Sequence, residues 1–159
     1  MPASDAEVKP YYSDDWVTLY HGDAREFVGC FDADVIITDP PYGVELVAKR
    51  TKLGASPQAA TLYADGEHEI RRLIADVIPA TLEHVGRGLI FCGARLMWCY
   101  PEPTAVGGVF VPSGTGNSSW GFQCFHPILY YGKDPFLAVG RGGRPNSFYD
   151  LRAGQESYD

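Results

Sequence analysis

The side chains best suited to chemistry lie together at residues 39–42, which are Asp39, Pro40, Pro41 and Tyr42. The Asp39 carboxylate and the Pro40 carbonyl are hydrogen-bond acceptors, and neither proline brings an N–H donor into the turn. Two acceptors aimed at the two N–H bonds of an exocyclic amino group favour the pyramidal nitrogen, whose lone pair attacks an electrophile. Tyr42 adds a flat ring on which a nucleobase outside its helix can stack. The four residues therefore predict a site that activates the amino group of a nucleobase.

The turn follows a run of apolar, β-branched residues at 34–38, which is typical of a buried central strand. Open α/β sheets place their ligands at the carboxyl ends of such strands, so the turn occupies a favourable position. Apolar residues at three- and four-residue spacing predict a helix over 67–86, and Pro79 within it predicts a kink or two shorter helices. Further strands are expected at 17–20, 88–92, 107–111 and 125–131, the last three as antiparallel neighbours, and a short helix at 23–27. The sequence thus predicts an α/β fold.

The turn and its surroundings resemble the S-adenosylmethionine-dependent DNA amino-methyltransferases, whose signature is Asp/Asn/Ser-Pro-Pro-Tyr/Phe. Residues 17–24, which contain Gly22-Asp23, are also similar to that family. So are residues 120–133, although His126 stands where many relatives have an acidic residue. The resemblance spans about residues 16–145, and the order of motifs is that of the permuted beta class. It implies part of a doubly wound, Rossmann-like methyltransferase sheet. Because Asp39 opens the signature, adenine is favoured over cytosine as the target base.

The resemblance implies S-adenosylmethionine as cofactor and DNA as partner. Asp39 and Pro40 would orient the amino group of a flipped base and Tyr42 would stack on it, while the amino nitrogen attacks the sulfonium methyl. Asp39 would also border the cofactor, and Asp23 matches the position that holds the adenosine end in the family. The alternative for Asp23 is a cap on the following helix. Trp120 or Phe122 could close on the base, although core packing is the favoured role for both.

The glycine-rich cofactor motif of the beta class, a strand followed by Asp-Pro-Phe-x-Gly-x-Gly, does not occur in these 159 residues. The stretch from Gly114 to Gly116 follows a predicted strand, but aromatic and β-branched residues come after it in place of a helix. The resemblance therefore implies a sheet without its glycine-rich strand, in which strand 34–38 has an unpaired edge. Strand 17–20 moving beside it, or edge-to-edge pairing of two chains in a homodimer, is expected; a partner chain carrying the motif is the third possibility.

Composition limits the partners of the chain. A formal net charge of −7 disfavours a protein that coats DNA, so any DNA contact must come from a local basic segment. We assign this contact to Lys49, Arg50 and Lys52 in the long connection 43–66; the alternative is that this connection is a solvated loop. The four cysteines and four histidines show no metal-ligand spacing, and no metal is expected. The chain has neither a signal peptide nor an apolar stretch of membrane-spanning length, which predicts a cytoplasmic, reducing location without membrane contact.

The expected organisation is a polar lead-in at 1–15, a partial methyltransferase catalytic domain at 16–138, and a flexible tail at 139–159 leading to an absent cofactor half. Two alternatives to an active DNA methyltransferase remain open. The first is an inactive truncated remnant, or a half-enzyme that a separate chain completes. The second is a methyltransferase that acts on RNA or on a protein amide, because Pro-Pro-Tyr/Phe signatures occur there too.

Overall fold

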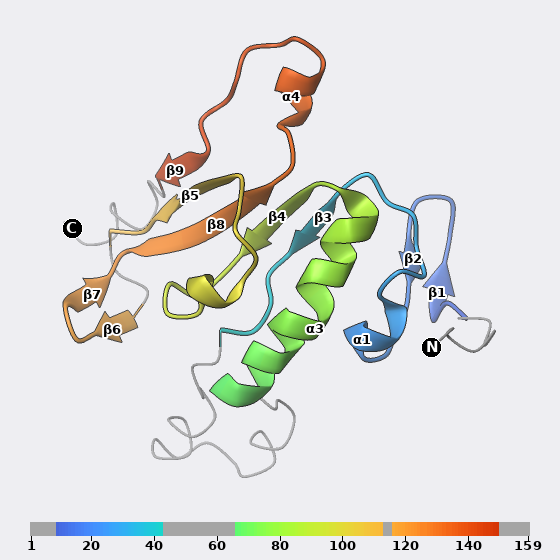
Figure 1. The fold of residues 1–159 in the computed structure, drawn as a ribbon, viewed down its shortest axis with the longest axis horizontal. Coiled ribbons are helices and arrows are strands. Elements are labelled where there is room, and N and C mark those ends of the chain that lie inside the picture. Colours follow the sequence, from blue (N-terminus) through green and yellow to red (C-terminus); the bar gives the residue numbers. More distant parts are fainter. Residues whose placement is uncertain (1–8, 43–65, 113–115, 150–159) are drawn as a thin grey trace, which may run out of the picture.

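The computed structural model describes residues 9–42, 66–112 and 116–149, and the expected DNA-binding residues Lys49, Arg50 and Lys52 lie outside these ranges, as does Gly114. A five-stranded mixed sheet in the order β3-β4-β8-β5-β9 forms the centre of the molecule (Figure 1). Its strands are β3 (Ile36–Thr38), β4 (Gly88–Phe91), β5 (Ala105–Phe110), β8 (Phe125–Tyr131) and β9 (Ser147–Tyr149). A short 3-10 helix, η2 (Met97–Cys99), lies between β4 and β5. The described part thus combines helix and sheet, while its likeness to a methyltransferase sheet stays a prediction.

The register of the sheet is set by β8, which pairs antiparallel with both β4 and β5. The three predicted strands are confirmed, with β8 between the other two. β3 pairs parallel with β4, so that Ile36 lies opposite Gly88 and Thr38 opposite Ile90. β4 is the only strand that pairs with β3 among the described residues. The strand that carries the signature turn is therefore at the edge of the sheet.

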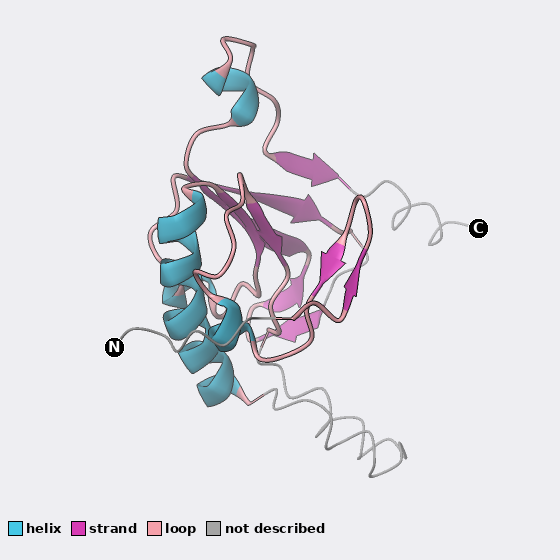
Figure 2. Cartoon of the chain, turned by 90° about the vertical axis from the view of Figure 1, so that its right-hand side faces the viewer, coloured by secondary structure: helices cyan, strands magenta, loops and turns pink. Residues whose placement is uncertain are grey.

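The helix α3 (Glu67–Val85) packs against one face of the sheet (Figure 2). It continues through Pro79 as one helix, so the predicted division into two is wrong. Pro79 removes the hydrogen bond to the Ala75 carbonyl, but Ala75 is exposed and water can replace the donor. The helix ends at Val85: the Gly86 N–H still donates to the Leu82 carbonyl at 2.9 Å, and the left-handed φ of 63° at Gly86 then turns the chain out of the helix. No helix in the described ranges is long and apolar enough to cross a membrane.

The core lies between α3 and the sheet. Ile70, Ile74 and Ile78 follow each other at four-residue spacing on the buried face of α3. They belong to one cluster with buried side chains from the sheet and from the segment after β4, namely Ile90, Cys92, Leu96, Tyr100, Leu129 and Tyr131. On the other face of the sheet, Val35 and Ile37 are 43% and 68% exposed. The sheet is thus well covered on the side of α3 and open beside the signature strand on the other.

The N-terminal segment forms a separate hairpin, β1 (Tyr12–Ser13) with β2 (Thr18–Leu19), followed by the short helix α1 (Ala24–Phe27). The expectation that the first strand moves beside the signature strand is wrong, because β2 pairs with β1 instead. The hairpin turn is held by Asp14, whose carboxylate accepts the N–H groups of Trp16 and Val17. A two-residue strand with exposed side chains would bury too little surface against β3 to compensate for the loss of this hairpin. The edge of β3 stays open among the described residues.

The C-terminal segment is more ordered than expected. After α4 (Pro135–Ala138), β9 pairs parallel with β5, so the sheet continues beyond the expected boundary at residue 138. Trp120 and Phe122 belong to the hairpin of β6 (Gly116–Ser118) and β7 (Gly121–Gln123) and are 98% and 78% exposed. Core packing was the wrong expectation for both, since the hairpin leaves the sheet just before β8 begins.

The core makes a direct prediction about stability. Ile74 is 1% exposed, and Ile74→Ala should lower the free energy of unfolding by about 2–5 kcal/mol through lost burial and a cavity. Ile37→Ala removes the same atoms from a site that is 68% exposed and should cost less than about 1 kcal/mol. Urea unfolding of both variants measures the difference. Equal losses would mean that α3 does not hold the core.

Candidate functional site

The signature turn leaves the carboxyl end of β3 beside the carboxyl end of β4, because the two strands run parallel. Gly93 follows β4 closely and lies against Tyr42: a Cβ added at Gly93 would meet the Tyr42 Cβ at 3.1 Å. An added Cβ there would require Tyr42 to shift slightly. Gly93 was not assigned to the site from the sequence. The signal was a lone glycine just after a predicted strand, where two chain segments approach closely.

Asp39 and Tyr42 are brought together by a hydrogen bond. The Tyr42 hydroxyl donates to Asp39 Oδ1 at 2.6 Å, and no described residue donates to Oδ2. Asp39 is exposed while Tyr42 is half-buried. Burial, and then the hydrogen bond to Asp39 and its charge, raise the pKa of Tyr42 far above its usual value, so the hydroxyl remains a donor at neutral pH. The carboxylate is thus fixed through one oxygen and open through the other.

His126 is a second residue that the sequence did not assign to the site. Its ring centroid lies 6.3 Å from that of Tyr42, with the ring planes tilted by 45°. His126 sits near the start of β8, which is antiparallel to β4 and therefore begins where β3 and β4 end. Beneath them, burial raises the pKa of Cys92 to about 11, so this thiol is neutral at pH 7. The turn therefore has the neutral Cys92 thiol below it and the His126 imidazole beside Tyr42.

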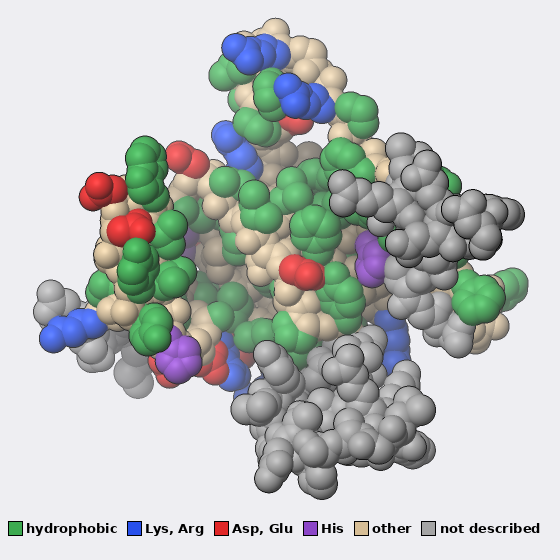
Figure 3. Space-filling view, turned by 180° about the vertical axis from the view of Figure 1, so that it is seen from behind, with side chains coloured by type: hydrophobic (Ala, Val, Ile, Leu, Met, Phe, Trp, Pro, Cys, Tyr) green, Lys and Arg blue, Asp and Glu red, His purple; other side chains and the backbone are tan. Residues whose placement is uncertain are grey.

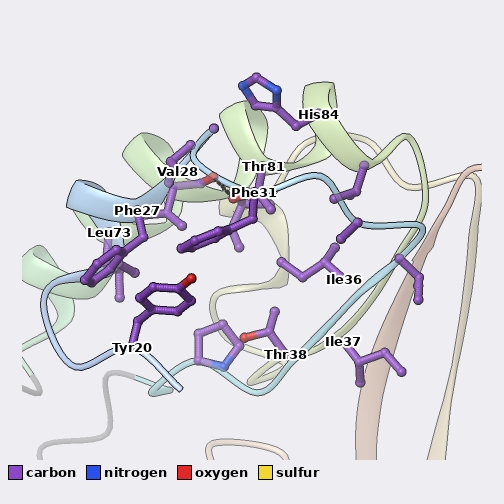
Figure 4. A pocket seen from close by; sticks show the side chains of 18 of the residues that line it. Tyr20, Phe27, Val28, Phe31, Ile36, Ile37, Thr38, Leu73, Thr81 and His84 are labelled. Atoms are coloured by element: carbon purple, nitrogen blue, oxygen red, sulfur yellow. Dashed lines mark hydrogen bonds between the residues drawn. The ribbon is translucent and has the colours of Figure 1, made fainter. Parts of the chain in front are cut away.

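A pocket of about 940 Å³ opens beside the turn, between β3, α3 and the segment from β2 to α1. Asp39, Pro40 and Pro41 line one end of it. The far wall is aromatic: the Tyr20 ring centroid lies 5.8 Å from Phe27 and 4.4 Å from Phe31, and Figure 4 shows the three rings gathered opposite the β3 side chains. The volume suits a ligand the size of a nucleotide or an extended peptide segment.

Asp23 is the N-cap of α1. Its Oδ1 accepts the Arg25 backbone N–H at 3.0 Å, and the Arg25 guanidinium contacts both carboxylate oxygens, at 2.9 and 2.5 Å. These hydrogen bonds to Arg25 lower the pKa of Asp23 to about 2. Asp23 does not line the pocket that Asp39 lines. The capping alternative is therefore confirmed, and a cofactor-binding role for Asp23 stays a prediction.

Positive charge in the C-terminal segment gathers away from the turn. Lys133 follows the end of β8. Because β8 runs antiparallel to β4 and β3 runs parallel to it, β8 ends at the edge of the sheet where β3 begins, opposite to the turn. The Arg144 guanidinium lies 3.9 Å from the Phe136 ring centroid in the same region. Among the residues the structure describes, no group of three His, Cys, Asp or Glu side chains could hold a metal ion.

The Asp23–Arg25 pair predicts a pH dependence of stability. Asp23→Asn keeps an acceptor for the cap but loses the ion pair, so it should lower the melting temperature less than Asp23→Ala does. Because the folded pKa lies below the usual 3.8, the carboxylate contributes above that value, and its contribution is lost as pH falls through about 2. Thermal unfolding at pH 5 and pH 2 should show the gap between wild type and Asn closing in acid. An unchanged gap would contradict the pairing.

Comparison with known proteins gives no relative: no family model, no curated protein and no solved structure matches the chain. The functional assignment consequently rests on the turn at the end of β3 and on the pocket beside it. Both are defined by described residues.

Proposed function

We propose that the chain carries the base-orienting part of an amino-methyltransferase site that acts on a base turned out of DNA, adenine in preference to cytosine. The observation that carries the proposal is the Asp39–Tyr42 hydrogen bond at the carboxyl end of β3, which fixes an exposed carboxylate whose other oxygen has no donor among the described residues. An acceptor held in this way needs no reorganisation when an amino group arrives. The end of a parallel strand pair is also where open α/β sheets place their ligands.

Each residue of the turn has a role in this proposal. Asp39 Oδ2 and the Pro40 carbonyl accept the two N–H bonds of the amino group, so that its lone pair points away from the ring plane. Tyr42 keeps Asp39 in position through its hydroxyl, and its ring is the surface on which the base would stack. The proton that the nitrogen loses afterwards passes to Asp39 or to solvent. Pro41 adds no donor that would compete for these acceptors.

S-adenosylmethionine would supply the electrophilic methyl group, and the described residues fit it in part. The pocket reaches Asp39 and Pro41, and its aromatic wall of Tyr20, Phe27 and Phe31 suits an adenine ring. Arg25 already engages the Asp23 carboxylate, which would otherwise accept ribose hydroxyls. Within residues 9–42, 66–112 and 116–149, no glycine-rich turn leads into a long helix that could bind the polar end of the molecule. These residues alone are therefore expected to bind it weakly.

Substitution of Asp39 tests the site. In a preparation that transfers methyl groups, Asp39→Ala should lower the rate by about a hundredfold or more, because a preorganised acceptor is lost. Asp39→Asn should be milder, since its amide oxygen still accepts one bond. The measurement is tritiated-methyl transfer from S-adenosylmethionine to DNA, RNA and protein in parallel, with circular dichroism as the folding control.

A near-wild-type rate in Asp39→Ala would reject the proposed site. Methyl acceptance by RNA or protein in place of DNA would select the alternative acceptor. Transfer to none of the three, in a chain that binds neither DNA nor cofactor, would favour the inactive remnant. Leu137→Ala serves as a matched control, because this exposed side chain follows the far end of β8 and should leave the rate unchanged.

Cofactor affinity gives a second test. Calorimetric titration of the 159-residue chain with S-adenosylmethionine should show binding far weaker than micromolar, for the structural reasons given above. One-to-one binding with a dissociation constant of micromolar or better would mean that the cofactor site is complete within this chain. Tyr20→Ala removes one ring of the aromatic wall. It should weaken any cofactor binding that the titration measures, which shows whether this wall contributes to the site.

A further inference from the structure

The open edge of β3 has backbone groups without partners. The Ile36 N–H donates to the Arg87 carbonyl at 3.1 Å, which places the backbone groups of Ile36 and Thr38 on the side of β4. Backbone groups alternate between the two sides of a strand, so the N–H and C=O of Ile37 point to the open side. No other described strand pairs there. Such an edge is a template for another strand.

The space beside this edge is an apolar slot rather than open solvent. The pocket of about 940 Å³ has Val35, Ile36 and Ile37 on one wall, and Tyr20 and Phe31 on the opposite wall. Figure 3 shows it from behind, as a hollow between the N-terminal hairpin and the sheet with hydrophobic side chains along its walls. A strand laid along β3 would lie about 4.8 Å from it and could fill the slot with every second side chain.

The rim of the slot is acidic. Residues 9–42 carry seven acidic and two basic side chains, a net charge of −5 out of −7 for the whole chain. Asp32 and Asp34 precede β3, Asp39 follows it, and the Glu26 carboxylate lies against Gly22 on the pocket wall. None of these four forms an ion pair with a described residue. Their field favours a positively charged occupant of the slot.

We propose that the open edge of β3 and the slot beside it take up a β-strand from a polypeptide outside these 159 residues, apolar at alternate positions and basic at its ends. Main-chain hydrogen bonds to Ile37 would hold the strand, and the aromatic wall would select its side chains, as in other cases of strand addition. A second copy of this chain does not fit. Its own acidic rim would face this one, and its hairpin would meet the hairpin that closes the slot.

Two peptides test the proposal with the full 159-residue chain, independently of cofactor and methyl transfer. The probe is a synthetic nine-residue peptide with alternating Val and Thr at its five central positions and two Lys at each end. The control peptide has Glu in place of each Lys. Fluorescence anisotropy should show the Lys peptide binding at least tenfold more tightly than the Glu peptide, with the difference shrinking at high salt. Equal binding of the two peptides would overturn the proposal.

The site of binding is tested by substitution. Ile37→Pro removes the N–H that faces the open side without removing a bond to β4, and should weaken binding of the Lys peptide at least tenfold. Ile37→Thr keeps the N–H and serves as the matched control, with affinity close to wild type. Equal binding by Ile37→Pro and wild type would reject strand addition. A concentration-dependent dimer of the free chain that Ile37→Pro abolishes would also overturn it, because the occupant would then be a second copy.

Hydrogen exchange of the wild-type chain supplies a readout that needs no variant. The Ile37 amide should exchange rapidly in the free chain and at least tenfold more slowly with saturating Lys peptide, whereas the Ile36 amide, already bonded to Arg87, should change much less. An Ile37 amide whose exchange does not respond to the peptide would contradict the proposal, even if the peptide binds elsewhere. Failure here leaves the Asp39 test untouched, so the two proposals stand or fall separately.

Discussion

The register between β3 and β4 joins the N-terminal segment to the sheet, together with the packing of α1 on α3. Pairing of Ile36 with Gly88 and of Thr38 with Ile90 places the end of β3 next to Gly93, where no side chain obstructs Tyr42. A slip of one residue would turn Ile36 and Thr38 away from α3 and expose the wrong face of the strand. It would also carry Asp39 and Tyr42 past the glycine that accommodates them. Both the candidate site and the pocket therefore depend on three residue pairs.

The sequence was most informative where the pattern was long. The helix over Glu67–Val85 and the seven-residue strand Phe125–Tyr131 were predictable, because many apolar residues repeat at the period of each element. In the N-terminal hairpin only β2 lies in a predicted strand, at 17–20, whereas β1 and the edge strand β9 carry no such signal, since exposed side chains give no period. Core packing was wrongly expected for Trp120 and Phe122, because aromatic side chains are buried only on average and both are exposed here.

Within the site, residue types were predictable and their partners were not. Asp39 and Tyr42 were assigned from their chemistry, but their hydrogen bond depends on the path of the turn, which no local pattern encodes. Gly93 and His126 come from other strands, so only the pairing of β3, β4 and β8 brings them near Tyr42. Asp23 was ambiguous because a carboxylate after a strand serves equally well as a cap or as a ligand. Arg25, two residues later, holds the carboxylate in the capping position.

The one-sided attachment of β3 has a consequence for the turn that follows it. Three residues bonded to a single neighbour belong to the part of a fold that opens at low free energy. Each opening of β3 also moves the turn, in which Tyr42 lies against Gly93, so edge and turn share one equilibrium. Linkage then requires reciprocity: whatever factor an occupant of the edge imposes on binding at the turn, a ligand at the turn imposes on binding of the occupant. A strand of three residues would thus act as the coupling element between two surfaces.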